Sequence, residues 1–192
     1  MVAVVVGGML TPGYSQLSNA ISELTAAGVP ARFLLTVLFV LYDGCLLVFA
    51  VAVPRTVIAT RSRAVIAGAI LLALVVVAGL GMSTMFPAGR SSDPITATGW
   101  VHIGLAAIAS LGSMGAVASF AAGTAREPEW RWFSRFSFAC VAAIFVSGLW
   151  AATMAAQLSP VMGLAERTTI GIFMIWLFVF AATLFKRSSR AS

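Results

Sequence analysis

Apolar residues dominate the chain in five long runs, which are separated by short polar segments. The runs cover residues 33–53, 64–86, 98–123, 136–156 and 164–185. About 20 apolar residues in a helix are enough to cross the hydrocarbon core of a bilayer. A backbone surrounded by lipid must satisfy its own hydrogen bonds, which an α-helix does within one segment. The pattern therefore predicts five membrane-spanning helices.

A shorter apolar segment, MVAVVVGGML, precedes these runs. As a helix it would be about 15 Å long, or half a membrane span. It has neither the basic start nor the cleavage site of a signal peptide. Two interpretations remain open: a half-helix, or the tail of a full first helix whose start lies upstream, which we prefer. In both cases we expect a single all-α domain over residues 1–192. It would be an integral membrane bundle of six helices, the first one short or truncated.

A polar stretch, PGYSQLSNAISEL, separates the short segment from the first long run. It predicts a short amphipathic helix that follows the Pro-Gly turn and is capped by Ser15. At helical spacing one face carries polar side chains and the opposite face carries Leu17, Ile21 and Leu24. The polar residues are Ser15, Asn19, Ser22 and Glu23. The helix either lies on the membrane with this face toward water, or covers the mouth of the bundle with it turned inward.

Composition supports the membrane assignment and restricts the possible partners. The chain is 60% hydrophobic and 9% charged, whereas soluble domains carry about 25% charged residues. The net charge of +6 is spread over short gaps and forms no basic stripe, which argues against a nucleic-acid partner. Cys45 and Cys140 lie inside apolar runs without metal-ligand spacing, so we expect neither a metal nor a cofactor. A single histidine also disfavours a haem.

The basic residues are distributed unequally between the two sides of the predicted bundle. Nine lie on the side of the C-terminal tail and three on the other side, which places the tail in the cytoplasm. The nine are Arg55, Arg61, Arg63, Arg126, Arg131, Arg135, Lys186, Arg187 and Arg190, and the three are Arg32, Arg90 and Arg167. Eleven arginines against one lysine indicate GC-rich codons. We therefore predict a multi-pass protein of a bacterial plasma membrane.

This topology gathers several polar residues on the extracytoplasmic side. His102 shares a helix face with Ala106 and Ala109, so it should point into the bundle, either as a structural hydrogen-bonding group or as a proton-transfer or ligand-binding group. Arg167 lies near a helix N-terminus, where the macrodipole disfavours a cation. We therefore expect it to pair with a carboxylate, Glu23 in preference to Asp93, with His102 close beneath.

Asp43 stands apart from this group. It lies eleven residues into the first long run, or about 16 Å deep in the membrane. A charged carboxylate at that depth is costly without a partner. Asp43 is therefore either protonated and hydrogen-bonded, or part of a proton relay.

Five short motifs occur in a recognisable order. They are PGYS at 12–15, ISEL at 21–24, FP at 86–87, Gly99-x-x-His102 and ER at 166–167. In this order they resemble the bacterial and archaeal membrane family called domain of unknown function 998, over nearly the whole chain. The resemblance implies about six helices and a common site for the extracytoplasmic residues, but no particular reaction. It also leads us to expect an acidic residue soon after FP, whereas here AGRSS intervenes before Asp93.

Three functions remain open. The first is an enzyme or lipid-binding protein with an outward polar pocket for a lipid or polyprenyl substrate. Glu23, His102 and Glu166 would then be catalytic, while the ligand would be bound by Tyr14, Ser15, Asn19, Asp93 and Arg167. The second is a non-enzymatic accessory subunit that packs against another membrane protein. The third is a transporter, ranked lowest because the sequence shows no repeated half. An enzyme requires the three catalytic groups to converge on a cavity, whereas a subunit does not.

Overall fold

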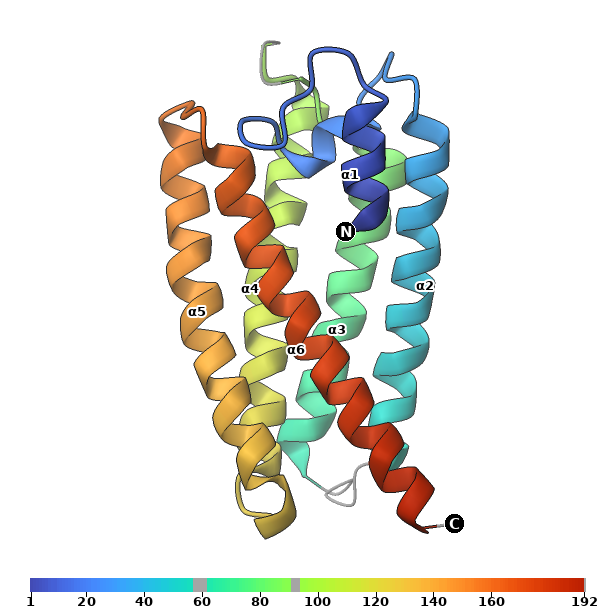
Figure 1. Cartoon of the computed structure of the whole chain (residues 1–192), viewed down its shortest axis with the longest axis vertical. Helices are drawn as coiled ribbons and strands as arrows, with labels where there is room; N and C mark the ends of the chain where they lie inside the picture. Colours follow the sequence, from blue (N-terminus) through green and yellow to red (C-terminus); the bar gives the residue numbers. More distant parts are fainter. Residues whose placement is uncertain (57–61, 91–93, 192) are drawn as a thin grey trace.

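The computed structural model describes residues 1–56, 62–90 and 94–191, which form a bundle of helices (Figure 1). The five long helices are α2 (Arg32–Thr56), α3 (Arg63–Leu80), α4 (Ala97–Thr124), α5 (Arg131–Ala156) and α6 (Met162–Ala191). The shorter elements are α1 (Val2–Met9), the 3-10 helices η1 (Ile21–Thr25) and η3 (Pro128–Trp130), and the π-helix η2 (Gly81–Met85). Five helical segments of the described chain are long and apolar enough to cross a membrane. The predicted helical membrane bundle is confirmed.

Consecutive long helices run antiparallel, so their connections gather at two ends of the bundle (Figure 1). One end, the loop end, carries residues 10–31 together with the α3–α4 and α5–α6 connections. The other, the tail end, carries the α4–α5 connection and the end of α6. The described basic residues separate as predicted: Arg32, Arg90 and Arg167 belong to the loop end, and the others to the tail end. Arg61 lies outside the described residues.

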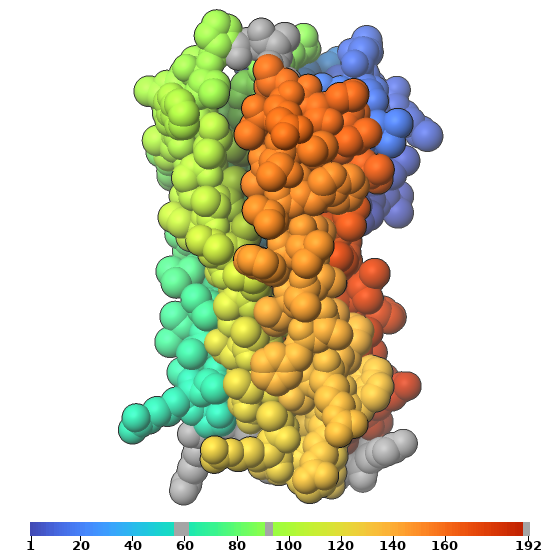
Figure 2. Space-filling view, turned by 90° about the vertical axis from the view of Figure 1, so that its left-hand side faces the viewer, coloured from blue at the N-terminus to red at the C-terminus, as the bar shows by residue number. Residues whose placement is uncertain are grey.

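The outer surface of the bundle is apolar along its length, as a lipid-facing surface must be. Figure 2 shows α4 and α5 side by side on one face of the elongated molecule, with α6 behind them. Large apolar side chains are exposed around the circumference, among them Phe33, Val48, Leu111, Val146 and Phe178.

Aromatic side chains fill the core toward the tail end. Phe120, Phe133, Trp176 and Phe180 are at most 1% exposed and contact one another ring to ring. The indole Nε1 of Trp176 donates a hydrogen bond of 2.9 Å to the hydroxyl of Ser137. Because this buried polar atom has a partner, the core avoids the cost of an unsatisfied donor.

Helices α3 and α4 approach closely because glycines line their contact. A Cβ atom built on Gly123 would lie 2.7 Å from Cγ2 of Val65, and one on Gly68 would lie 3.0 Å from the ring of Phe120. A methyl group at position 123 would force Val65 to shift, and one at position 68 would press against the ring of Phe120. The contact therefore has the small-residue character typical of membrane helix pairs.

A second apolar cluster holds residues 10–31 against the bundle. It consists of Val4, Ile21, Leu24, Ala31 and Leu35, contributed by α1, the loop and α2. Leu24 is completely buried. The loop is therefore anchored by its own hydrophobic side chains.

The amphipathic helix predicted from Ser15 to Leu24 is shorter than expected. Residues 14–20 are not helical, with a turn at 16–18, and within the predicted segment the only helix is Ile21–Thr25, a 3-10 helix. The Asn19 side chain accepts a hydrogen bond of 2.9 Å from the backbone N–H of Ser15, and the Ser15 hydroxyl accepts one from Leu17 N–H. These local side-chain bonds compete with helix formation. As a result Leu17 is 55% exposed and does not share the buried face of Leu24.

Candidate functional site

The predicted site residues of the loop meet the beginning of α6 at the loop end. We call this group the loop cluster; it comprises Tyr14, Gln16, Asn19, Glu23, Glu166 and Arg167. Two backbone segments join within it, since Leu164 N–H donates a hydrogen bond of 3.0 Å to the carbonyl of Leu17.

Arg167 is the centre of the loop cluster. Its Nε donates to Oε1 of Gln16 at 3.0 Å, and Nη1 donates to the carbonyls of Asn19 and Gly163 at 2.9 and 2.8 Å. Nη2 donates to the Tyr14 hydroxyl. The guanidinium carbon lies 5.7 Å from the centroid of the Tyr14 ring. The planar guanidinium thus uses donors on all three nitrogens, a geometry that lysine does not offer.

Glu23 is directed into the protein and binds within its own loop. It is 7% exposed, its Oε1 accepts from Ala20 N–H at 2.8 Å, and its Oε2 accepts from the Asn19 amide at 3.1 Å. It therefore caps the start of η1. The direct Arg167–Glu23 bond that we expected is not among the hydrogen bonds of Arg167, which all go to neutral oxygens. Arg167 lies more than one turn inside α6, where the macrodipole is weaker, and the turn at 16–19 directs a carbonyl toward it.

Glu166 connects α6 to the same 3-10 helix from the other side. Its Oε2 accepts a hydrogen bond of 2.8 Å from the backbone N–H of Ile21. This N–H is the first of η1 and has no partner within the helix. Both carboxylates of the loop cluster therefore satisfy backbone donors at the beginning of η1.

Tyr14 remains a neutral phenol. Burial raises its pKa to about 12, an effect that the neighbouring Arg167 only partly opposes. The hydroxyl accordingly donates to the carbonyl of Ala20 at 3.0 Å while accepting from Arg167. A phenol with this pKa keeps its proton at neutral pH and does not serve as a base.

His102 makes its hydrogen bond outside the loop cluster. It is 7% exposed on α4, and its Nδ1 lies 2.7 Å from the carbonyl oxygen of Phe86, directly after η2. A carbonyl oxygen only accepts hydrogen bonds, so Nδ1 carries the proton. This bond ties α4 to the end of α3, and the structure does not connect His102 by hydrogen bonds to Glu23 or Glu166.

The remaining predicted ligand-binding residues are Ser15 and Asp93. Ser15 shapes the turn before η1 through its backbone and hydroxyl bonds. Asp93 lies outside the described residues. Within the described part of the chain, no group of three or more His, Cys, Asp and Glu residues could hold a metal ion.

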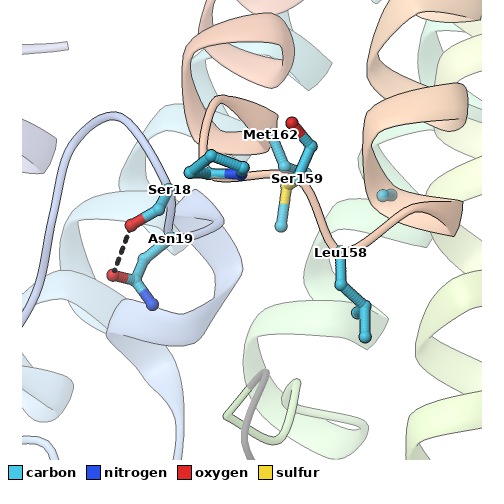
Figure 3. A pocket seen from close by; sticks show the side chains of 7 residues that line it. Ser18, Asn19, Leu158, Ser159 and Met162 are labelled. Atoms are coloured by element: carbon cyan, nitrogen blue, oxygen red, sulfur yellow. Dashed lines mark hydrogen bonds between the residues drawn. The ribbon is translucent and has the colours of Figure 1, made fainter.

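A cavity of about 310 Å³ lies beside the loop cluster, between the loop and the α5–α6 turn (Figure 3). Its lining consists of Ser18, Asn19, Ala155, Leu158, Ser159, Pro160 and Met162. Among the predicted site residues that the structure describes, only Asn19 contributes to it. Sequence reasoning placed the connection between the last two runs at this end of the bundle but assigned none of its residues to the site, although its Ser159-Pro160 pair is a turn signal.

Leu158 forms one edge of this cavity through an unusual backbone conformation. Its φ of 50° is left-handed, and Ser159 N–H donates back to the carbonyl of Met154 at 2.9 Å. These features define a Schellman ending of α5, in which glycine usually takes the left-handed position. The leucine side chain instead projects outward and is 83% exposed.

Comparisons with known proteins assign the chain to a family without an assigned activity. No curated protein and no solved structure matches it. The family described as Protein of unknown function (DUF998) matches residues 1–183. Since this match covers nearly the whole chain, the protein belongs to that family.

Proposed function

We propose that the protein is a non-catalytic membrane protein that binds the polar head group of a lipid in the cavity beside the loop cluster. The observation that carries this proposal is the composition of the cavity. Ser18, Asn19 and Ser159 offer hydroxyl and amide groups, whereas Leu158 and Met162 offer apolar surface. An amphipathic lining at the end of a membrane bundle suits a molecule with a polar head and an apolar tail.

The cavity favours an uncharged, hydrogen-bonding head group. None of the described residues that line it carries a charge, and its volume is near the lower end of the range for small-molecule sites, about 300–1,000 Å³. A hydroxylated, uncharged head group, such as the sugar of a neutral glycolipid, fits these conditions. With the predicted topology, this lipid would come from the outer leaflet of a bacterial plasma membrane.

The hydrogen bonds of the loop cluster support a role without catalysis. Glu23 and Glu166 accept bonds from backbone N–H groups, and Tyr14 is a neutral phenol. A general acid or base needs a free position facing the substrate. None of the three lines the cavity, so the cluster serves to hold the loop that forms one of its walls.

Lipid retention by a cavity-filling variant tests the proposal. In native mass spectrometry of protein released gently from membranes, the wild type should carry a bound lipid. Ala155→Phe should lose it, because a phenyl ring would occupy the cavity lined by Ala155. Ala152→Phe, one turn deeper on α5 at another exposed alanine outside the lining, should retain it. Equal retention by all three proteins would contradict the proposal.

An accessory subunit remains the second candidate. It is favoured by the same observation that the acid and base groups are engaged in structural hydrogen bonds. In that case the wild type would carry no lipid in the cavity. It would instead leave native membranes in a complex of fixed stoichiometry with another membrane protein.

A further inference from the structure

Asp43 interrupts the inward-facing apolar stripe of α2. Leu35 lies in the apolar cluster of the loop end, and Leu46, Ala50 and Val53 lie in the core of the tail end. Asp43 is placed between the two groups at helical spacing and is only 6% exposed. A titratable group therefore occupies the boundary between two apolar clusters, inside a membrane-spanning helix.

The carboxyl group lies directly against the backbone of α3. A Cβ atom built on Gly79 would be 2.8 Å from Oδ2 and 2.9 Å from Oδ1 of Asp43. Only glycine leaves space for the carboxyl group here. One turn further toward the loop end, the Ser83 hydroxyl donates to the Gly79 carbonyl at 2.9 Å. The π-helix η2 begins two residues after Gly79, and such departures from α-helical geometry are frequent at functional sites.

No described residue forms a hydrogen bond or an ion pair with Asp43. The charged groups of the elements packed on α2 do not provide a partner: η1 contributes Glu23, which has the same charge, and α3 contributes Arg63 at the opposite end of the bundle. Helix α1 and η2 contain no charged side chain. A carboxylate without a counter-ion is strongly disfavoured in this setting.

The protein does not completely enclose the carboxyl oxygens of Asp43. Within the described chain, every fully enclosed side-chain nitrogen or oxygen has a hydrogen-bond partner. The oxygens of Asp43 have none, so they are not fully enclosed. A water molecule that reaches them is enough to carry a proton in or out.

We propose that Asp43 is a reversible proton-binding site within the membrane-spanning part of the bundle. Its neutral, protonated form fits the apolar surroundings, and the incomplete enclosure of its oxygens is the proposed route by which water exchanges the proton. This site is separate from the lipid cavity and does not depend on it. Because the carboxyl group lies against Gly79, a proton bound to Asp43 would change the contact between α2 and α3.

Carbodiimide labelling tests the proposal, because a carbodiimide reacts with a protonated carboxyl group in an apolar environment. The reagent takes up the carboxylic proton, is attacked by the carboxylate oxygen, and rearranges to a stable N-acylurea. With dicyclohexylcarbodiimide in membranes, we expect one adduct, mapped to Asp43 by peptide mass spectrometry. Labelling should fall several-fold as the pH is raised. It should be lost in Asp43→Asn and kept in Glu23→Gln and Glu166→Gln.

Three results would overturn the proposal. An adduct that persists in Asp43→Asn would place the reactive carboxyl elsewhere. Labelling of Asp43 that does not change with pH would show a permanently protonated group. Protection by sodium chloride, but not by choline chloride at equal ionic strength, would make Asp43 a site for a metal cation. Peptide mapping of the wild type decides among these results even if Asp43→Asn fails to fold.

Discussion

Arg167 illustrates how one side chain can organise a loop that has little regular structure of its own. The guanidinium reaches a side-chain amide, two backbone carbonyls and a phenol. Hydrogen bonds that involve a charged group contribute about 1.5–3 kcal/mol each to stability, more than neutral ones. The position of the loop should therefore depend more on Arg167 than on any other polar residue of the loop cluster.

Arg167→Ala should lower the free energy of unfolding by about 1.5–3 kcal/mol, because its loss leaves several partly buried acceptors without a charged donor. Arg167→Lys should recover only part of this, since an ammonium group lacks the planar fork. The measurement is the melting temperature in detergent. Glu129→Ala is the control, because Glu129 pairs with Arg187 through a side chain that is 72% exposed. Such exposed pairs contribute about 0–1 kcal/mol.

A double-mutant cycle separates the bonding pattern of the structure from the ion pair suggested by the sequence. Arg167→Ala and Tyr14→Phe should be coupled by about 0.5–3 kcal/mol, as expected for residues in contact. The effects of Arg167→Ala and Glu23→Gln on the free energy of unfolding should be more nearly additive than those of the first pair. Strong coupling of the second pair without coupling of the first would show that the expected ion pair forms in solution.

At the scale of elements, the α3–α4 contact depends on the absence of side chains. Gly123→Ala should destabilise the bundle by about 1–3 kcal/mol, because the new methyl group would meet Val65 and overpack the contact. Gly104→Ala, on an exposed face of the same helix with open space around it, should be neutral or slightly stabilising. Thermal unfolding in one detergent compares the two variants, and equal effects would contradict a specific contact.

The long helices could be predicted from the sequence, whereas the loop could not. A bilayer requires about 20 apolar residues per span, so the apolar runs give the positions of α2 to α6, with ends that differ from the helices by up to about six residues. No comparable length requirement of the bilayer applies to the loop. Its conformation depends on the side-chain bonds of Asn19 and on the bond from Ile21 to Glu166, 145 positions away. Periodicity contains no information about either.

The sequence predicts which residues of the candidate site lie at the same end of the bundle, but it does not predict their hydrogen-bond partners. The alternation of spans correctly brings Tyr14, Glu23 and Arg167 to one end of the bundle. It does not reveal that Arg167 binds neutral oxygens or that His102 binds Phe86. These choices depend on local backbone directions that arise only when the loop folds.

For the whole molecule, the unequal distribution of basic residues predicts the orientation in the membrane. In a variant without Cys45 and Cys140, a cysteine at the exposed Gly89 should react with a membrane-impermeant maleimide on intact cells. A cysteine at the exposed Glu127, at the opposite end, should react only after permeabilisation. The reverse pattern would place the cavity on the cytoplasmic side and exclude an outer-leaflet lipid.

The bonds between the loop and α6 also have a consequence for biosynthesis. They join residues 145 to 153 positions apart, so the loop is synthesised long before the helix that supplies its partners. Until α6 leaves the ribosome, the loop has no cation to organise it and η1 has no second carboxylate at its start. Docking of the loop is therefore a late step of assembly, and it distinguishes a chain that contains α6 from one that ended before α6.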